Sequence, residues 1–165
     1  MKSSIFFLAA LSTACGLLLT LVLMERSVIG LFLGDAASVS EDDIRLTFSA
    51  LKRLVDVLPY TLGVLIAASF LLGVLQARGT GWRPLSVLVL IILAAPMFYN
   101  IVLADTALVV SNLKSTAPGD DLTIVQKSLR DAALQHFIGF VAFLLALTVQ
   151  ALHILVGVRA PGTPS

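Results

Sequence analysis

Four long apolar blocks, separated by more polar segments, dominate the chain. They cover residues 5–24, 58–76, 85–104 and 137–158. A helix rises about 1.5 Å per residue, so about 20 apolar residues cross the hydrocarbon core of a bilayer. The pattern predicts an all-α integral membrane protein. Its expected fold is an up-down bundle of four helices, one membrane domain over residues 1–158, with a disordered tail at 159–165.

The last block shows the clearest helical pattern. Its polar and small residues recur at alternating steps of three and four, at His136, Gly139, Phe143, Ala146, Gln150, His153 and Gly157. Such spacing follows one stripe of a helix, and we expect this stripe to pack against the other spans. Leu144, Leu145 and Leu152 lie off the stripe and are expected to face lipid.

The first two blocks carry stripes of mostly small residues, which allow helices to approach closely in membranes. In the first block these are Ala9, Ser12, Gly16 and Thr20, and in the second Gly63, Ala67, Phe70 and Val74. The first block resembles a secretory signal at its start, but its apolar run continues through GLLLTLVLM. We therefore expect a retained helix, since a signal is cleaved after a shorter apolar region.

An amphipathic helix is predicted before the second block. Ser40 and Asp43 form a capping box, in which each side chain can satisfy a free amide of the first turn. Apolar residues then recur at helical spacing, at Ile44, Phe48, Leu51, Val55 and Leu58. Pro59 is expected to kink the chain or restart the helix, because proline lacks an amide hydrogen.

Turn residues divide the rest of the chain. The segment ARGTGWRP predicts a tight hairpin between the second and third blocks. Pro96 should kink the third helix, which we expect to continue to a C-cap at Asn112. After the loop STAPGDD, Asp120 or Asp121 is expected to cap the last helix.

Composition supports the membrane class. Hydrophobic residues make up 58% of the chain and charged residues 13%, and the mean hydropathy is +1.01. Soluble domains carry about a quarter charged residues. The net charge of +1 gives no sign of nucleic-acid binding, and the single Cys15 excludes an intramolecular disulfide.

The charges also predict an orientation. Lys2, Arg78, Arg83 and Arg159 lie in short segments without acids, whereas all ten Asp and Glu residues belong to the two long segments. Dense basic charge in short segments favours the cytoplasmic side. We therefore expect a multi-pass protein of the cell membrane with both termini in the cytoplasm.

Candidate chemistry is sparse. The two histidines are 17 residues apart on one helix, about 25 Å along its axis, so they cannot share a metal within one chain. No metal site, cofactor motif or nucleophile motif is predicted. Six polar residues are expected near the extracytoplasmic end of the bundle and form a candidate pocket: Glu25, Arg26, Tyr60, Tyr99, Asn100 and His136.

Each of these residues also has a structural interpretation. Glu25 and Arg26 suit an interfacial pair, the tyrosines an aromatic belt, Asn100 an interhelical hydrogen bond, and His136 an interfacial place at the end of a helix. Under either interpretation we expect Asn100 and His136 to meet, because both face inward and lie within about one helical turn in depth.

The order of features resembles a family of small four-helix membrane proteins that includes anthrone-oxygenase-like members. The resemblance rests on Gly16 in the first span, a polar helix before the second, Asn100 or Asn112 near the end of the third, and LRDAALQHFIGFVAFLLAL entering the fourth. It implies a membrane oxygenase-like enzyme acting on a hydrophobic aromatic or quinone-like substrate, with His136 and Asn100 as candidate residues.

Two functions of different classes follow. The small-residue stripes and the lack of a catalytic constellation favour a small membrane module that binds a membrane protein partner or a second copy of the chain, or that stabilises a complex. The alternative is the oxygenase-like enzyme, which would bind a hydrophobic small molecule. A transporter subunit is disfavoured, since the spans lack multiple carboxylates.

Overall fold

The computed structural model describes residues 2–26, 39–79, 81–102 and 106–159, without the side chains of residues 2, 3, 59, 97–102, 106–108 and 157–159. In these ranges the secondary structure is entirely helical, which confirms the all-α class. The helices are α1 (Lys2–Met24), α3 (Glu41–Leu54), α4 (Leu58–Gly79), α5 (Pro84–Val102), α6 (Thr106–Ser115) and α7 (Leu122–Arg159).

Three helices are long and apolar enough to cross a membrane. The qualifying stretches are Ser4–Met24, Tyr60–Gly79 and Leu122–Val156, and the apolar stretch of α5, Pro84–Pro96, is shorter. The chain is therefore helical, with three helices whose length and composition suit a membrane protein.

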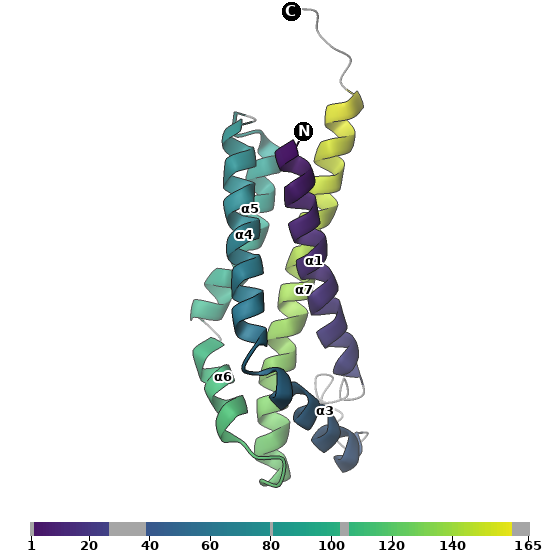
Figure 1. The fold of residues 1–165 in the computed structure, drawn as a ribbon, viewed down its shortest axis with the longest axis vertical. Coiled ribbons are helices and arrows are strands. Elements are labelled where there is room, and N and C mark those ends of the chain that lie inside the picture. The colour runs from purple at the N-terminus through teal and green to yellow at the C-terminus, as the bar shows by residue number, and fades with distance from the viewer. Residues whose placement is uncertain (1, 27–38, 80, 103–105, 160–165) are drawn as a thin grey trace, which may run out of the picture.

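Four helices lie side by side (Figure 1). α1 packs against α4 and α7, and α5 packs against the same two helices. The start of α1, the turn between α4 and α5 and the end of α7 lie at one end of the molecule.

At the turn between α4 and α5, Gly81 and Trp82 have positive φ, and the Trp82 amide donates to the Ala77 carbonyl at 2.7 Å. The predicted hairpin is confirmed.

The packing stripe of α7 follows the prediction. Phe143, Ala146 and Gln150 are buried. Leu144, Leu145 and Leu152 are about half exposed on the outer side of α7. Their alternation places one face of this helix in the protein interior.

The predicted stripes of α1 and α4 are wrong. Ala9, Ser12, Gly16 and Thr20 are all exposed, and α1 instead buries Phe7, Leu11, Ala14, Leu18 and Leu21. On α4, Gly63, Ala67 and Phe70 are exposed, whereas Ser69, Gly73, Gln76 and Ala77 are buried. Long side chains make many more dispersion contacts than small ones, which favours burial of Phe7, Leu11 and Leu18, although Phe6 and Leu23 of α1 stay exposed.

Buried residues of α1, α5 and α7 form one hydrophobic core. A second hydrophobic core lies at the other end of the molecule. It joins α3, α6 and the first turns of α7, which together we call the cap (Figure 1). Its buried residues are Ile44, Phe48, Leu51, Val55, Val109, Leu113, Val125, Leu129 and Ala132. The predicted amphipathic stripe of α3 is thus confirmed. Ser40 is the N-cap of α3, and its hydroxyl accepts from the Asp43 amide at 3.1 Å.

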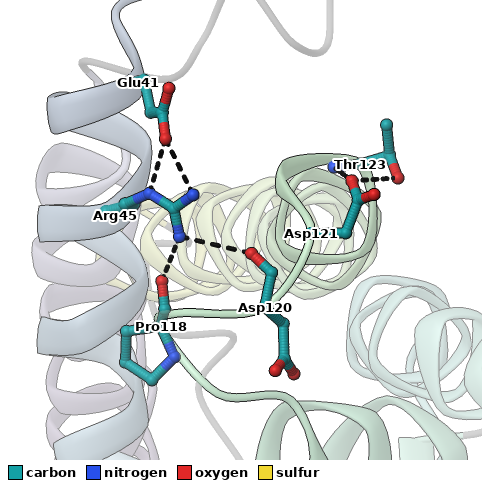
Figure 2. A network of polar contacts seen from close by, with 6 residues as sticks. All are labelled: Glu41, Arg45, Pro118, Asp120, Asp121 and Thr123. Atoms are coloured by element: carbon teal, nitrogen blue, oxygen red, sulfur yellow. Dashed lines mark hydrogen bonds and ion pairs between the residues drawn. The ribbon is translucent and has the colours of Figure 1, made fainter.

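Polar contacts hold α3 against the loop before α7 (Figure 2). The Arg45 guanidinium donates to the carbonyl oxygens of Pro118 and Asp120 and pairs with Glu41. The Lys52 ammonium donates to the Thr116 carbonyl oxygen. These charged side chains satisfy loop carbonyls that no helix can pair, so they fix the loop on α3.

Asp121 caps α7, as expected for one of the two aspartates. Its carboxylate accepts from the amide and the hydroxyl of Thr123 at 2.9 and 2.8 Å (Figure 2). Hydrogen bonds to the charged carboxylate hold the pKa of Asp121 below its usual range.

The predicted long third helix is divided. α5 ends at Val102 and α6 begins at Thr106, with residues 103–105 outside the described ranges. Asn112 is not a C-cap, because α6 runs to Ser115 and the Asn112 carbonyl accepts from the Thr116 amide. The start of α4 at Leu58 confirms that the helix restarts beside Pro59.

The close approach at Gly73 generates a prediction. A Cβ atom there would lie 2.7 Å from Leu90 Cδ2 and 3.2 Å from Phe7 Cζ. We expect Gly73→Leu to lower the free energy of unfolding by about 1–3 kcal/mol through overpacking. Gly16→Leu is the control, since a Cβ at Gly16 meets nothing described within 4 Å. Denaturation in detergent measures both, and equal stability of the two variants would contradict this packing.

Candidate functional site

A cavity of about 210 Å³ lies where the two cores meet. The core of α1, α5 and α7 contributes Leu18, Leu93 and Phe143, and the cap contributes Leu51, Val55, Val109, Leu113 and Ala132. The remaining described lining residues are Leu58, Leu62, Gly63, Ile66, Pro96, Val110, Gln135, His136 and Gly139. Among all of these, only Gln135 and His136 carry polar side chains.

Two helix breaks at the same level explain the cavity. The chain passes from α3 to α4 between Leu54 and Leu58, and from α5 to α6 between Val102 and Thr106. Residues before and after both breaks line the cavity, whereas α7 passes it without interruption. Because four helix ends meet one continuous helix, side chains from neither core fill the junction completely.

His136 is held by a carboxyl group from another helix. Its Nδ1 lies 2.8 Å from Oε1 of Glu25. The Glu25 side chain is 3% exposed and that of His136 is 12% exposed. Glu25 follows α1 directly, and its amide still donates to the Leu21 carbonyl at 3.0 Å, which turns the residue toward α7. Burial makes each group dependent on the other as its polar partner.

The Glu25 contact involves Nδ1 of His136, and His136 also lines the cavity. No described residue forms a hydrogen bond with Nε2. When Nδ1 donates its hydrogen to the carboxylate, Nε2 of a neutral imidazole is an acceptor. Among the described lining residues, His136 and Gln135 are therefore the polar groups in otherwise apolar surroundings.

The structure brings together only part of the candidate pocket. Glu25 and His136 are in contact, but Tyr60 is 74% exposed and Arg26 is also exposed. The exposure of Tyr60 fits its alternative place in an interfacial belt. The side chains of Tyr99 and Asn100 lie outside the described residues, so the contact of Asn100 with His136 stays a prediction.

Polar residues at the opposite end of α7 form a separate group. Gln76 of α4 and Gln150 of α7 are buried and exchange two amide hydrogen bonds, at 3.0 and 2.9 Å. Nearby, Ser86 Oγ lies 3.5 Å from His153 Nδ1. These two reciprocal amide bonds link α4 to α7.

The sequence did not reveal that cap residues form the outer wall of the cavity. Val110 carried no signal in the sequence, and Gly139 was predicted only as part of the packing stripe of the last helix. Within the described ranges, no group of three or more His, Cys, Asp or Glu side chains is placed to hold a metal ion.

The buried pair generates a prediction for a double-mutant cycle. We expect His136→Phe to lower the free energy of unfolding by about 2–3 kcal/mol, because Glu25 then lacks its polar partner. The double variant Glu25→Leu/His136→Phe should lose less than the sum of the single variants, with a coupling of about 1–2 kcal/mol. Strict additivity in detergent denaturation would show that the two groups do not interact.

Comparisons with protein-family models, with curated protein sequences and with solved structures find no match to this chain. The chemistry of the site therefore rests on the cavity and on the Glu25–His136 pair.

Proposed function

We propose that the protein crosses the cell membrane four times, with α5 as the fourth span beside α1, α4 and α7. α1 begins and α7 ends at the same end of the molecule, which fits an even number of crossings (Figure 1). The 19 residues of α5 extend about 28 Å, close to the thickness of the hydrocarbon core. Both termini are assigned to the cytoplasm, and the cap to the opposite side.

We infer that the cavity binds a small aromatic or quinone-like molecule. An engineered apolar cavity of about 150 Å³ accommodates benzene, so a cavity of about 210 Å³ has room for a substituted ring. The observation that carries this function is the single polar pair at an apolar wall. A ring would contact the Leu, Ile, Val and Phe side chains, while a hydroxyl or carbonyl group would bond to His136.

Binding does not by itself imply turnover. A histidine held by a carboxyl group can accept a proton from a bound phenol, so the pair also suits an enzyme of the oxygenase-like class implied by the resemblance. The proposed function is ligand binding. Enzymatic conversion of the bound ligand is a further step that this function would permit.

A membrane module that binds a partner is the second candidate. The observation that favours it is the exposed stripe of Ala9, Ser12, Gly16 and Thr20 on α1. No described helix of the chain covers this stripe, and small residues permit close contact with a helix of another protein or of a second copy.

The topology can be tested by cysteine labelling in intact cells. In a Cys15→Ala background, we expect Ser115→Cys in the cap to react with an impermeant maleimide from outside. Gly79→Cys at the α4–α5 turn should react only after permeabilisation. Both sites are exposed, so the membrane and not burial decides the result. The reverse pattern would overturn the assigned orientation.

Ligand binding can be tested with 1-naphthol and naphthalene, which differ by one hydroxyl group. Near saturation, at about 100 times Kd, we expect 1-naphthol to stabilise the purified protein by about 2–3 kcal/mol, seen as a rise in Tm. Val110→Trp should abolish the rise by filling the cavity, whereas Val64→Trp on the exposed face of α4 should not.

The role of the polar pair has its own control. The double variant Glu25→Leu/His136→Phe keeps similar side-chain volumes but loses the hydrogen-bonding atom. We expect it to bind naphthalene as before and 1-naphthol about fivefold more weakly, the equivalent of one hydrogen bond of about 1 kcal/mol. Stabilisation of Val110→Trp equal to that of the unaltered protein would reject the cavity as the binding site.

A further inference from the structure

The cavity opens at the side of α4. Among the described residues that line it, Gly63 is exposed, eight others keep part of their surface exposed, and the rest are buried. A Cβ atom added at Gly63 would meet no described atom within 4 Å. Of the described lining residues, Gly63 is therefore the one at which the cavity comes to the surface.

The surface around this opening is apolar. Gly63 lies within Tyr60–Gly79, one of the stretches apolar enough to cross a membrane. It is three residues after Tyr60, which is about 4.5 Å along the helix axis. Its neighbours on α4, Tyr60 and Val64, are 74% and 68% exposed. An opening bordered by such residues faces acyl chains when α4 spans the bilayer.

The cap closes the cavity on the side that faces water. Val55, Leu113 and Ala132 are buried between the cavity and the cap surface. Arg45 and Lys52 hold α3 to the loop before α7. Entry from water would require separation of the cap core, whereas entry at Gly63 passes the exposed side chains of Tyr60 and Val64.

We propose that the cavity takes up its ligand sideways from the bilayer through a portal at Gly63. This inference rests on the proposed function and narrows the ligand class to ring compounds dissolved in the membrane, with one hydroxyl or carbonyl group for His136. An apolar ring concentrates among acyl chains because its transfer from water is favourable. The bilayer thus supplies the ligand at the depth of the portal.

A size series at position 63 tests the portal in the full chain in lipid nanodiscs. Stopped-flow fluorescence follows association and dissociation of 1-naphthol for Gly63→Ala, Gly63→Val and Gly63→Trp. We expect both rates to fall with side-chain size, by about tenfold for Gly63→Trp, because an obstructed portal slows both directions. The association rate should follow the naphthol-to-lipid ratio at a fixed aqueous concentration.

Gly16→Trp is the matched control. Gly16 is also an exposed helical glycine with nothing described within 4 Å of an added Cβ, but it does not line the cavity. Equal association rates for Gly63→Trp and Gly16→Trp, or rates that follow only the aqueous naphthol concentration, would overturn the portal. If Gly63→Trp does not fold, Gly63→Val decides by the same criterion.

The result separates the portal from the proposed function. If the unaltered protein binds 1-naphthol and Val110→Trp does not, the cavity is the binding site whatever the rates at position 63. If the unaltered protein fails to bind 1-naphthol, or Val110→Trp binds it equally well, the binding function is rejected and the portal with it.

Discussion

The continuity of α7 is the constraint on which the rest of the structure depends. This single helix, Leu122–Arg159, packs against α1 and α5 along one part and against α3 and α6 along the other. Its backbone hydrogen bonds need no partner outside the helix, so it can pass from the cap into an apolar environment without a break. The other helices end or begin beside α7. Its contacts with α1 and α5, and with α3 and α6, fix where they lie.

The cavity is a consequence of that arrangement. α7 supplies a continuous wall, while α3 gives way to α4 and α5 to α6 at the same level. His136 sits on α7 at this level and meets Glu25 from the end of α1. Gln76 and Gln150, farther along α7 from the cap, bond to each other, whereas His136 bonds to Glu25 and lines the cavity. Of these two polar pairs on α7, only the Glu25–His136 pair has a member that lines the cavity.

Local pattern predicted much of the fold because local interactions decide it. The stripe of α7 from Gly139 to Gln150, the amphipathic face of α3 and the cap at Ser40 depend on helical periodicity and on neighbouring amides. The same reasoning failed for α1 and α4, where Gly16 and Gly63 are exposed and Phe7 and Gly73 are buried. In a chain this apolar, lipid and protein interior are chemically similar, so hydrophobicity alone does not distinguish the two faces of a helix.

By itself, the sequence determined the helical class, the apolar lengths and most helix limits, since these follow from composition, periodicity and turn residues. It also indicated His136 and Glu25 as candidates at one depth. Only the tertiary structure decided that they are partners, 111 residues apart, and that cap and membrane helices enclose a cavity beside them. Burial and contact between distant residues depend on how helices are rotated about their axes, and that rotation is fixed by packing against the other helices.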